Sequence, residues 1–444
     1  MTPKPLIFIF LLLPFSAIVF AQNGSGEYTN NWPQWRGPLA TGEAPVGHPP
    51  IEWSETKNVK WKIEIPGKGH STPIIWGDKV FVLTAAESDE KIENKETGES
   101  VSGDMRGLTA TNVLDFKVMA INRANGKVIW DKTVIKETPV DGTHETGTWA
   151  SNSPVTDGEF LYAYFGSRGL YCLDFEGNIL WERDFGQMSK KMNFGEGSSP
   201  ALYQDKIVVL WDHEGDSYLY ILDKKTGKDI MKISRDEATS WSSPLIVEFN
   251  GKAQVITSAT AYIRSYDLET GEIIWKATGM TANVIPHPIV NNGMLYLMSG
   301  FRGNALMAID LAKAKGDLQG TDAMVWEYNK NTSYTPSALL DNGMLYFLRS
   351  NNGNLTCLDA VDGKENYSLE RLDGTGTIFA SPVGADGRIY ITSQSGISYV
   401  VKQGPAFEII AKNELEDGNF SSPAISGNEL FIRGFKYLYC ISEQ

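Results

Sequence analysis

The chain has few of the residues on which several large classes of protein depend. Only three of its 444 residues are cysteine, which excludes a disulfide framework, and only five are histidine. Basic residues are outnumbered by acidic ones, 40 against 54, and the formal net charge is therefore −14. Nucleic acids and anionic membrane surfaces favour positively charged proteins, so we expect neither as a partner.

Sustained helical periodicity is also missing, whereas turn-forming residues are abundant. The chain has 43 glycines and 20 prolines, an inventory that suits many short strands better than long helices. A hydrophobic content of 42% describes an ordinary globular core. The length would suggest about three domains, but all-β propellers and barrels are exceptions to that estimate.

The longest apolar run lies at the N-terminus, where Lys4 precedes the segment 6–20 and Ala21 follows it. This run of about 15 residues is interrupted by Pro14, whereas a transmembrane helix needs roughly 20. We therefore expect a secretory signal peptide over residues 1–21 and no membrane span. No cysteine follows the run, so a lipid anchor is not expected. The mature chain would be exported, to the periplasm or the extracellular space.

A short signature then recurs along the chain: a small hydroxyl residue, proline, a few apolar residues, a Gly/Asp/Asn turn and an apolar strand. The anchor prolines are separated by 81, 46, 44, 44, 48, 46 and 41 residues. They are Pro73, Pro154, Pro200, Pro244, Pro288, Pro336, Pro382 and Pro423. Seven gaps make eight repeats, of which only the first is abnormally long.

Each repeat contains four strand-like segments separated by turns. Two of these segments are the Leu170–Asp174 type, LYCLD, and the Gly126–Trp130 type, GKVIW. Four short strands in about 45 residues are typical of a β-propeller blade. The sequence therefore predicts an all-β, eight-bladed β-propeller of four-stranded antiparallel blades over residues 58–444, preceded by an N-terminal extension at 22–57.

The two ends of the repeat region complement each other. The eighth repeat stops after its third strand, and a fourth-strand unit with Trp61 in the usual position stands alone before the first repeat. A solenoid would leave both ends exposed, whereas pairing residues 59–65 with 437–441 closes a ring and removes the free edge. We therefore expect the N-terminal strand to complete the last blade. The long first gap is interpreted as a loop insertion at 86–115.

Polar and aromatic residues gather in the connections that open on one face of such a ring. In a propeller, the loops from the fourth strand to the next first strand, and from the second strand to the third, share a face. Because binding residues concentrate on loops held by a rigid scaffold, we take this as the candidate ligand-binding face. Its candidate residues are His70, His144, Trp149, Glu196, His213, Trp241, His287, Arg302 and Arg349.

Several of these residues also have a purely structural interpretation. His70 and Trp149 could simply plug the funnel, and the acidic loop around His213 has the residue types of a metal site but no fixed ligand spacing. We therefore predict no metal site and no catalytic residue. The tryptophans four residues after a turn glycine are expected in the core, whereas Trp149 and Trp241 fall outside that pattern and suit stacking on a planar ligand. Cys172, Cys357 and Cys440 fall in non-neighbouring blades and are expected to be buried free thiols.

The repeats resemble the PQQ-like (pyrroloquinoline-quinone-type) propeller repeat, which quinoprotein dehydrogenases share with the outer-membrane-assembly propeller BamB. Asn31–Pro38 (NWPQWRGP), together with KGHSTP and SSPAISGNELFIRGFKYLYCI, is similar to segments of a large group of exported bacterial propellers. The resemblance covers residues 31–442. It implies the fold directly and leaves two functions open.

The first function is a non-catalytic binding or scaffold module without a cofactor, most simply a monomer, whose partner is an envelope protein or an extracellular small molecule or glycan. The alternative is a PQQ-dependent alcohol or sugar dehydrogenase, with a quinone over the channel and Ca²⁺ polarising it. The chain departs from the dehydrogenases because it has no adjacent cysteine pair and no C-x-x-C-H haem motif. No G-x-S-x-G or H-E-x-x-H motif supports hydrolysis either. We therefore prefer the binding module.

Overall fold

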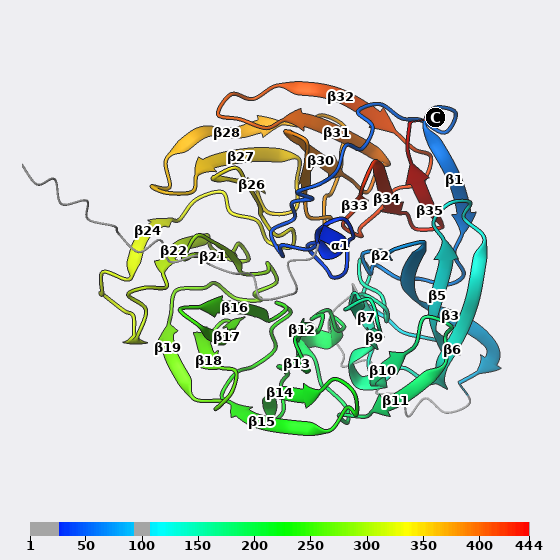
Figure 1. Ribbon diagram of the computed structural model, residues 1–444, viewed down its shortest axis with the longest axis horizontal. Coiled ribbons are helices and arrows are strands. Elements are labelled where there is room, and N and C mark those ends of the chain that lie inside the picture. Colours follow the sequence, from blue (N-terminus) through cyan, green and yellow to red (C-terminus); the bar gives the residue numbers. More distant parts are fainter. Residues whose placement is uncertain (1–25, 93–106, 444) are drawn as a thin grey trace, which may run out of the picture.

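Eight four-stranded sheets surround a central axis in the computed structural model, which describes residues 26–92 and 107–443. Figure 1 looks down this axis and shows one strand of each blade near the centre and another at the rim. Pairing is antiparallel between consecutive strands of every blade. The expected eight-bladed β-propeller is confirmed. The expected signal peptide, residues 1–21, lies outside the described residues.

The strands fall into four sets according to their position in the blade. The innermost strands are β2 (Ile74–Trp76), β8 (Val155–Thr156), β12 (Ala201–Tyr203), β16 (Leu245–Phe249), β20 (Ile289–Asn291), β25 (Leu339–Asp341), β29 (Val383–Ala385) and β33 (Ala424–Ser426). The second strands are β3 (Lys79–Lys91), β9 (Leu161–Tyr164), β13 (Lys206–Trp211), β17 (Lys252–Ser258), β21 (Met294–Ser299), β26 (Met344–Leu348), β30 (Arg388–Thr392) and β34 (Glu429–Arg433). The third strands are β5 (Asn112–Asn122), β10 (Leu170–Leu173), β14 (Ser217–Asp223), β18 (Ile263–Asp267), β22 (Ala305–Asp310), β27 (Asn354–Asp359), β31 (Ile397–Lys402) and β35 (Tyr437–Ile441). The outer strands are β6 (Val128–Glu137), β11 (Ile179–Arg183), β15 (Asp229–Arg235), β19 (Ile273–Ala277), β24 (Met324–Tyr328), β28 (Glu365–Arg371), β32 (Ile409–Glu414) and β1 (Val59–Glu64).

A few short elements lie outside this plan. β23 (Gly316–Asp317) adds a parallel fifth strand to the fourth blade beside β19, and β4 (Gly107–Leu108) pairs with β7 (Thr143–His144). One helical turn, α1 (Gly26–Thr29), and two 3-10 turns, η1 (Gly166–Arg168) and η2 (Lys191–Asn193), complete the described secondary structure.

The ring is closed by the N-terminal strand, as the sequence predicts. β1 pairs antiparallel with β35, so that Val59 lies opposite Ile441 and Glu64 opposite Tyr437. The indole of Trp61 is buried against the first blade, and its Nε1 donates a hydrogen bond to the backbone oxygen of Arg123 at 2.8 Å. The last blade is thereby complete and leaves no free strand edge at the closure.

The same indole-to-backbone contact recurs between other neighbouring blades. Trp130, Trp181 and Trp326 each donate from Nε1 to a backbone oxygen of the following blade, at 2.9, 3.1 and 3.2 Å. The turn that receives Trp61 contains Gly126, whose φ is +72° and whose absent Cβ would lie 2.9 Å from the indole. Glycine is therefore required there both by the backbone conformation and by the close approach of the ring. These tryptophans pack into the core as expected, although only Trp61 is buried and Trp130, Trp181 and Trp326 are partly buried against it.

Around the channel, side-chain hydroxyls link each blade to the next. The backbone N–H groups of Thr72, Ser153, Ser199, Ser337 and Ser381 each donate to the hydroxyl of the following blade at 2.8–2.9 Å. In the sixth blade, β25 begins one residue after Ala338, whereas the other inner strands begin one residue after the anchor proline. The anchor chosen at Pro336 was therefore wrong by two residues, because Ser337 and Ala338 occupy the Ser-Pro position.

The long first gap contains an extended hairpin. β3 and β5 remain paired from Lys79 opposite Asn122 to Lys91 opposite Asn112, which extends well into the segment 86–115. Part of the segment that we interpreted as a loop is therefore regular β-structure. Residues 93–106 of that segment lie outside the described residues.

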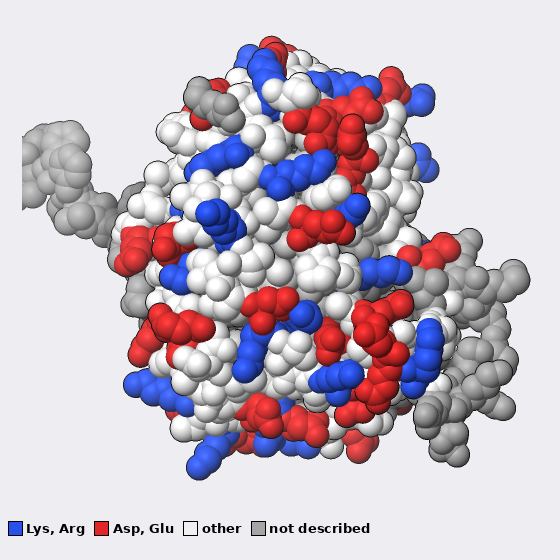
Figure 2. Space-filling model, turned by 90° about the vertical axis from the view of Figure 1, so that its right-hand side faces the viewer, with Lys and Arg blue, Asp and Glu red and all other residues white. Residues whose placement is uncertain are grey.

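The surface carries both signs of charge. In the side view of Figure 2, acidic and basic residues are interspersed over the rim. Among the described residues, no helix has the length and apolar character needed to cross a bilayer. Cys172, Cys357 and Cys440 are buried and free, as expected.

Candidate functional site

A cavity of about 650 Å³ opens at one end of the central channel, which we call the upper mouth. Its walls come from the loops that precede the inner strands and from the loops between second and third strands, which is the face that the sequence singled out. All eight blades contribute lining residues. Six aromatic side chains form much of the wall, one from each of the third to the eighth blades: Phe194, Trp241, Phe301, Tyr334, Phe379 and Phe420.

The structure brings five of the nine candidate residues together and leaves four elsewhere. His70, His144, Glu196, Trp241 and Arg302 line the cavity. The remaining four are not among the lining residues, and they are Trp149, His213, His287 and Arg349. A position on the upper face was therefore not sufficient for a residue to reach the cavity.

Trp241 is held rigidly at the cavity wall. Its Nε1 donates to the backbone oxygen of Gly195 at 2.8 Å, and its backbone N–H donates to the oxygen of Val284 at 2.9 Å. Behind the indole, the buried Lys190 ammonium lies 5.9 Å from the ring centroid. Lys190 donates to the oxygens of Asp212 and Ser240, and burial lowers its pKa. The indole is therefore preorganised, with its polar edge already satisfied and its apolar surface available to the cavity.

Glu196 is the one carboxylate among the lining residues. Its two oxygens accept from the backbone N–H and the hydroxyl of Ser167, at 2.7 and 2.5 Å. Burial raises the pKa of Glu196, and the hydrogen bonds from Ser167 and the charge of Lys190 oppose that rise. Ser167 therefore fixes the Glu196 carboxylate in place and leaves it only partly available to a ligand.

Two histidines at the upper mouth are packed against aromatic rings. The imidazole of His70 lies edge-on to Phe420 at 5.2 Å, and burial, together with the positive charges of Arg433 and Lys68, lowers its pKa to about 3. His70 is consequently neutral at physiological pH. His144 lies 5.2 Å from Phe194, and its Nδ1 is within 2.7 Å of the Thr146 hydroxyl.

Arg302 and Arg349, both in loops between second and third strands, are exposed. The Arg302 guanidinium lies 5.3 Å from the ring of Phe301 at the cavity rim. Arg349 does not reach the lining.

Trp149 and His213 stabilise the conformation of the loops that carry them. Trp149 donates from Nε1 to the backbone oxygen of Asp141 at 2.9 Å and packs against the hydrophobic core. Nδ1 of His213 accepts from the N–H groups of Ser189 and Gly215, and Nε2 lies 3.0 Å from the oxygen of Asp216. This loop faces a separate shallow groove formed with residues 234–238. The contacts of Trp149 and His213 therefore agree with a structural role for these two residues.

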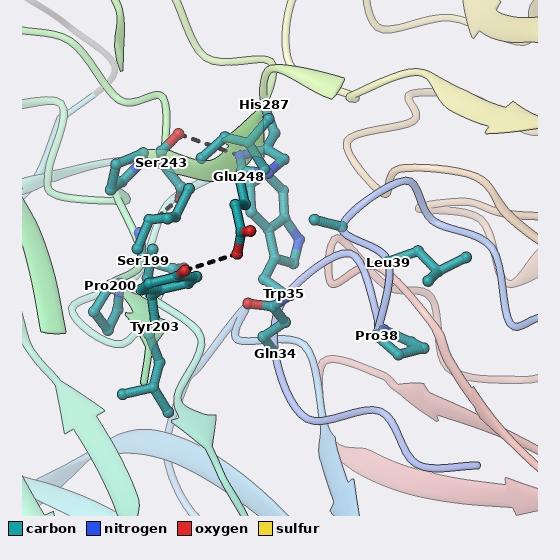
Figure 3. Close-up of a pocket in the computed structure, with 16 residues that line it drawn as sticks. Gln34, Trp35, Pro38, Leu39, Ser199, Pro200, Tyr203, Ser243, Glu248 and His287 are labelled. Carbon is teal, nitrogen blue, oxygen red and sulfur yellow. Dashed lines mark hydrogen bonds between the residues drawn. The ribbon is translucent and has the colours of Figure 1, made fainter. Parts of the chain in front are cut away.

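His287 lies deeper in the channel and contacts a residue that the sequence did not single out. Its imidazole lies edge-on to the indole of Trp35, with ring centroids 5.5 Å apart (Figure 3). A small cavity of about 50 Å³ beside them is lined by inner-strand residues of the third and fourth blades, including Tyr203, which hydrogen-bonds to Glu248 at 3.0 Å. Burial and the nearby charge of Arg36 lower the pKa of His287 to about 3.

The opposite end of the channel, the lower mouth, is closed by the N-terminal extension. Residues 31–48 follow the inner strands, with backbone bridges from Trp32 to Ile75, from Glu43 to Gly384 and from Gly47 to Gly427. In Figure 1 this dark blue segment starts near the centre of the ring and runs outward toward β1. Trp35 lines both the upper cavity and the small cavity below it. The upper cavity is consequently a blind pocket with Trp35 in its floor.

Arg36 of this segment is buried, with 1% of its surface exposed. Its guanidinium donates to the backbone oxygens of Pro382, Ala338 and Thr41, at 2.9, 2.7 and 3.1 Å. Burial lowers its pKa to about 9, so it stays protonated at neutral pH. Arg36 lies in the WPQWRGP segment, which carries part of the family resemblance noted in the sequence. Nothing in that segment indicated that it lies in the channel.

The fit of the dehydrogenase alternative can be judged from the donors in the cavity. A site for a Ca²⁺-bound quinone needs several oxygen ligands for the metal ion and a second carboxylate that acts as the base. The lining offers Glu196 alone, already bonded to Ser167, and the described residues contain no cluster of three His, Cys, Asp or Glu side chains placed to hold a metal. The residues present do not fit that assembly, and we derive no redox step from them.

Eight blades of four strands, joined by indole and hydroxyl contacts at a fixed repeat, define a propeller of the PQQ-like class. The chain belongs to the family described as outer membrane protein assembly factor BamB, whose model matches residues 114–230 and 215–444. This finding confirms the resemblance noted in the sequence.

Individual relatives are distant. The outer membrane protein assembly factor BamB of Shewanella oneidensis is 23% identical over 263 residues, which cover 46% of this chain and 65% of that protein. The match thus spans less than two thirds of the relative's own length.

Solved structures share the fold at low identity. The crystal structure of BamB from Moraxella catarrhalis aligns with a TM-score of 0.54 at 15% identity, over 82% of this chain and 98% of that one. The quinohemoprotein alcohol dehydrogenase of Comamonas testosteroni aligns with a TM-score of 0.62 at 10% identity, over 96% and 83%. Both likenesses concern the fold alone.

Proposed function

We propose that this protein is an exported, non-catalytic binding module of the cell envelope, whose upper mouth takes up a ligand or a segment of another envelope component. The observation that carries the proposal is the blind cavity of about 650 Å³, to which every blade contributes. Its volume falls within the range of roughly 300–1,000 Å³ that is usual for ligand sites, and its aromatic wall supplies the usual anchors of such sites.

The family relationship supports an envelope role. The described family and the Shewanella oneidensis relative are both named as outer membrane protein assembly factors. An exported propeller that works beside other envelope proteins agrees with the apolar run at residues 6–20 and with the acidic net charge of the chain.

Site-specific cross-linking in the cells that make the protein tests this proposal. A photo-reactive amino acid is placed at the upper rim, at position 191 or 302, and in parallel at the exposed lower-face positions 225 and 361. We expect discrete adducts from the upper positions alone, lost when Trp241→Ala and Arg302→Ala are combined in the copy labelled at position 191. Adducts that form only from the lower face would refute the assignment of the binding face.

The lower-face positions are suitable controls because substitution there leaves the blades intact. The side chain of Val361 is 74% exposed, and Lys225 is exposed in the turn after β14. Asp157, another turn residue, would be a poor control because it is paired with Lys224 at 2.7 Å and caps its own turn.

A further inference from the structure

We propose that the ligand of the upper cavity is a carbohydrate, which enters as the end of a glycan chain. This inference rests on the proposed binding function and adds the chemical class of the ligand. It follows from the hydrogen-bonding groups that the cavity leaves unused and from the aromatic surfaces between them.

A ring of hydroxyl groups near the base of the cavity supplies donors. Ser153, Ser199, Ser381 and Ser422 all line the cavity and are each at most 7% exposed. Each hydroxyl oxygen accepts a backbone N–H of the preceding blade at 2.9 Å. In the part of the chain that the structure describes, none of these four hydroxyls donates to a protein acceptor. The ring therefore presents four O–H donors to whatever occupies the cavity.

The same lining also contains an unused acceptor. Asn283 is 4% exposed and lines the cavity, and its side chain hydrogen-bonds with the Tyr334 hydroxyl. Its Oδ1 accepts no hydrogen bond from a described residue. A buried acceptor without a partner is costly, so a ligand that donates to Asn283 is favoured. The ligand must consequently both accept from the serine ring and donate to the amide.

The charges at the cavity argue against a simple anion. A carboxylate or a phosphodiester could accept from the serines but has no hydrogen to donate to Asn283 Oδ1. His70 is neutral, and the cations Arg302 and Lys191 are exposed, whereas Glu196 lines the cavity with its carboxylate bonded to Ser167. A neutral polyol avoids repulsion from Glu196 and offers hydroxyls that donate and accept at once.

An extended peptide also fits less well. Strand addition requires free backbone donors along a sheet edge. At the level of the serine ring, the N–H groups of Thr72, Ser153, Ser199, Ser337 and Ser381 are already taken by hydroxyls of the next blade. The floor at Trp35 also prevents a chain from passing through the ring, so that only a chain end can enter.

The aromatic wall suits the apolar faces of sugar rings. Phe301 and Tyr334 are stacked with centroids 4.8 Å apart, and Phe379 contacts Phe420 at 4.6 Å. These rings, with Trp241, lie above the hydroxyl ring and remain partly exposed within the cavity. Pyranose rings present C–H faces to aromatic surfaces and hydroxyls at their edges, which matches this layering of apolar wall over polar base.

Titration of the mature protein with defined sugars tests the inference. Maltohexaose, cellohexaose, xylohexaose and chitohexaose are added separately while the fluorescence of the tryptophans is recorded, and binding is verified by calorimetry. Citrate and an alanine pentapeptide serve as the anion and peptide probes. We expect at least one oligosaccharide to bind and to be weakened roughly 3- to 10-fold by Phe379→Ala and by Phe301→Ala, from the loss of one aromatic contact.

Two controls make the result decisive. Val361→Ala on the lower face should leave the affinity for the sugar unchanged, and far-ultraviolet circular dichroism identifies any variant that fails to fold. Absence of binding by all four oligosaccharides at millimolar concentration overturns the inference, as does binding of citrate or the pentapeptide that is lost in Phe379→Ala. If the upper-face cross-links form while no sugar binds, the carbohydrate assignment fails and the proposed binding function stands.

Discussion

The two mouths of the channel are built from the same eight strands and yet differ completely. The upper mouth is an open cavity of about 650 Å³, walled by loops that differ from blade to blade. The lower mouth is closed by residues 31–48, which add backbone bridges to the inner strands of the first, seventh and eighth blades. The eight repeats alone would give a channel open at both ends. One unrepeated segment converts that pore into a blind pocket.

The comparison also separates stability from recognition. Trp32 and Arg36 in the lower seal are at most 1% exposed, whereas Trp241 and the aromatic wall of the upper mouth remain accessible. Residues of the seal should therefore affect the free energy of unfolding, and residues of the cavity should affect binding. Four predictions test this division.

The largest effect is expected from deleting residues 22–66, which removes both the seal and β1. The last blade would lose its outer strand and expose β35, and the inner strands would lose their bridges to the extension. We expect the truncated protein to lose the cooperative thermal transition of the full chain, as measured by calorimetry. A truncated protein that melts like the mature chain would show that ring closure contributes little.

Two tryptophans three residues apart provide the next test. Trp32 is fully buried against the first blade, and Trp32→Ala should lower the free energy of unfolding by about 3–5 kcal/mol. Trp35 is only partly buried in the cavity floor, and Trp35→Ala should cost only about 1–2 kcal/mol. Denaturant unfolding measures both, and equal costs would contradict the distinction between seal and floor.

Two arginines extend the comparison to the two mouths. Arg36→Ala leaves the oxygens of Pro382 and Ala338 without their donor in a buried site, and we expect a loss of about 3 kcal/mol. Arg302→Ala at the exposed upper rim should change stability by no more than about 0.5 kcal/mol. The same denaturant titrations apply. A strongly destabilised Arg302→Ala variant would mean that the upper rim also supports the ring.

The smallest effect concerns pH at the lower mouth. Burial, with the negative charge of Asp341 adding to it, raises the pKa of Glu43 to about 7. Between about pH 4.5 and 7 the folded protein holds a proton that the unfolded chain has released, so the contribution of Glu43 to stability is lost as the pH rises through this window.

Glu43→Gln should therefore remove that dependence and stabilise the protein at pH 8 by about 1–2 kcal/mol, a range that allows for partial solvent screening. Unfolding of both proteins at pH 5 and pH 8 provides the measurement. An unchanged difference between the two pH values in the variant would show that Glu43 titrates as it does in the unfolded chain.

The sequence could predict which face of the propeller carries the candidate site. It could not predict which side chains of that face contact one another or line the cavity. Loop position correctly placed His70, Glu196 and Trp241 at one mouth, because the blade plan assigns each connection to a face. It could not tell that the His213 loop turns toward a separate groove, or that Trp149 bonds to its own loop. Those outcomes depend on loop conformation, which side-chain contacts within each loop decide.

The sequence by itself determined the number of blades, the four-stranded plan and the closure of the ring by β1. These properties follow from local patterns, such as strand alternation, turn glycines and a tryptophan at a fixed offset, and a period of about 45 residues repeats them eight times. Only the tertiary structure decided that the extension lies in the channel, that Arg36 bonds to blades about 300 residues away and that the upper mouth is blind. The extension has no repeat and no alternation of its own, and its conformation is set by the backbone groups that the assembled inner strands leave open to it.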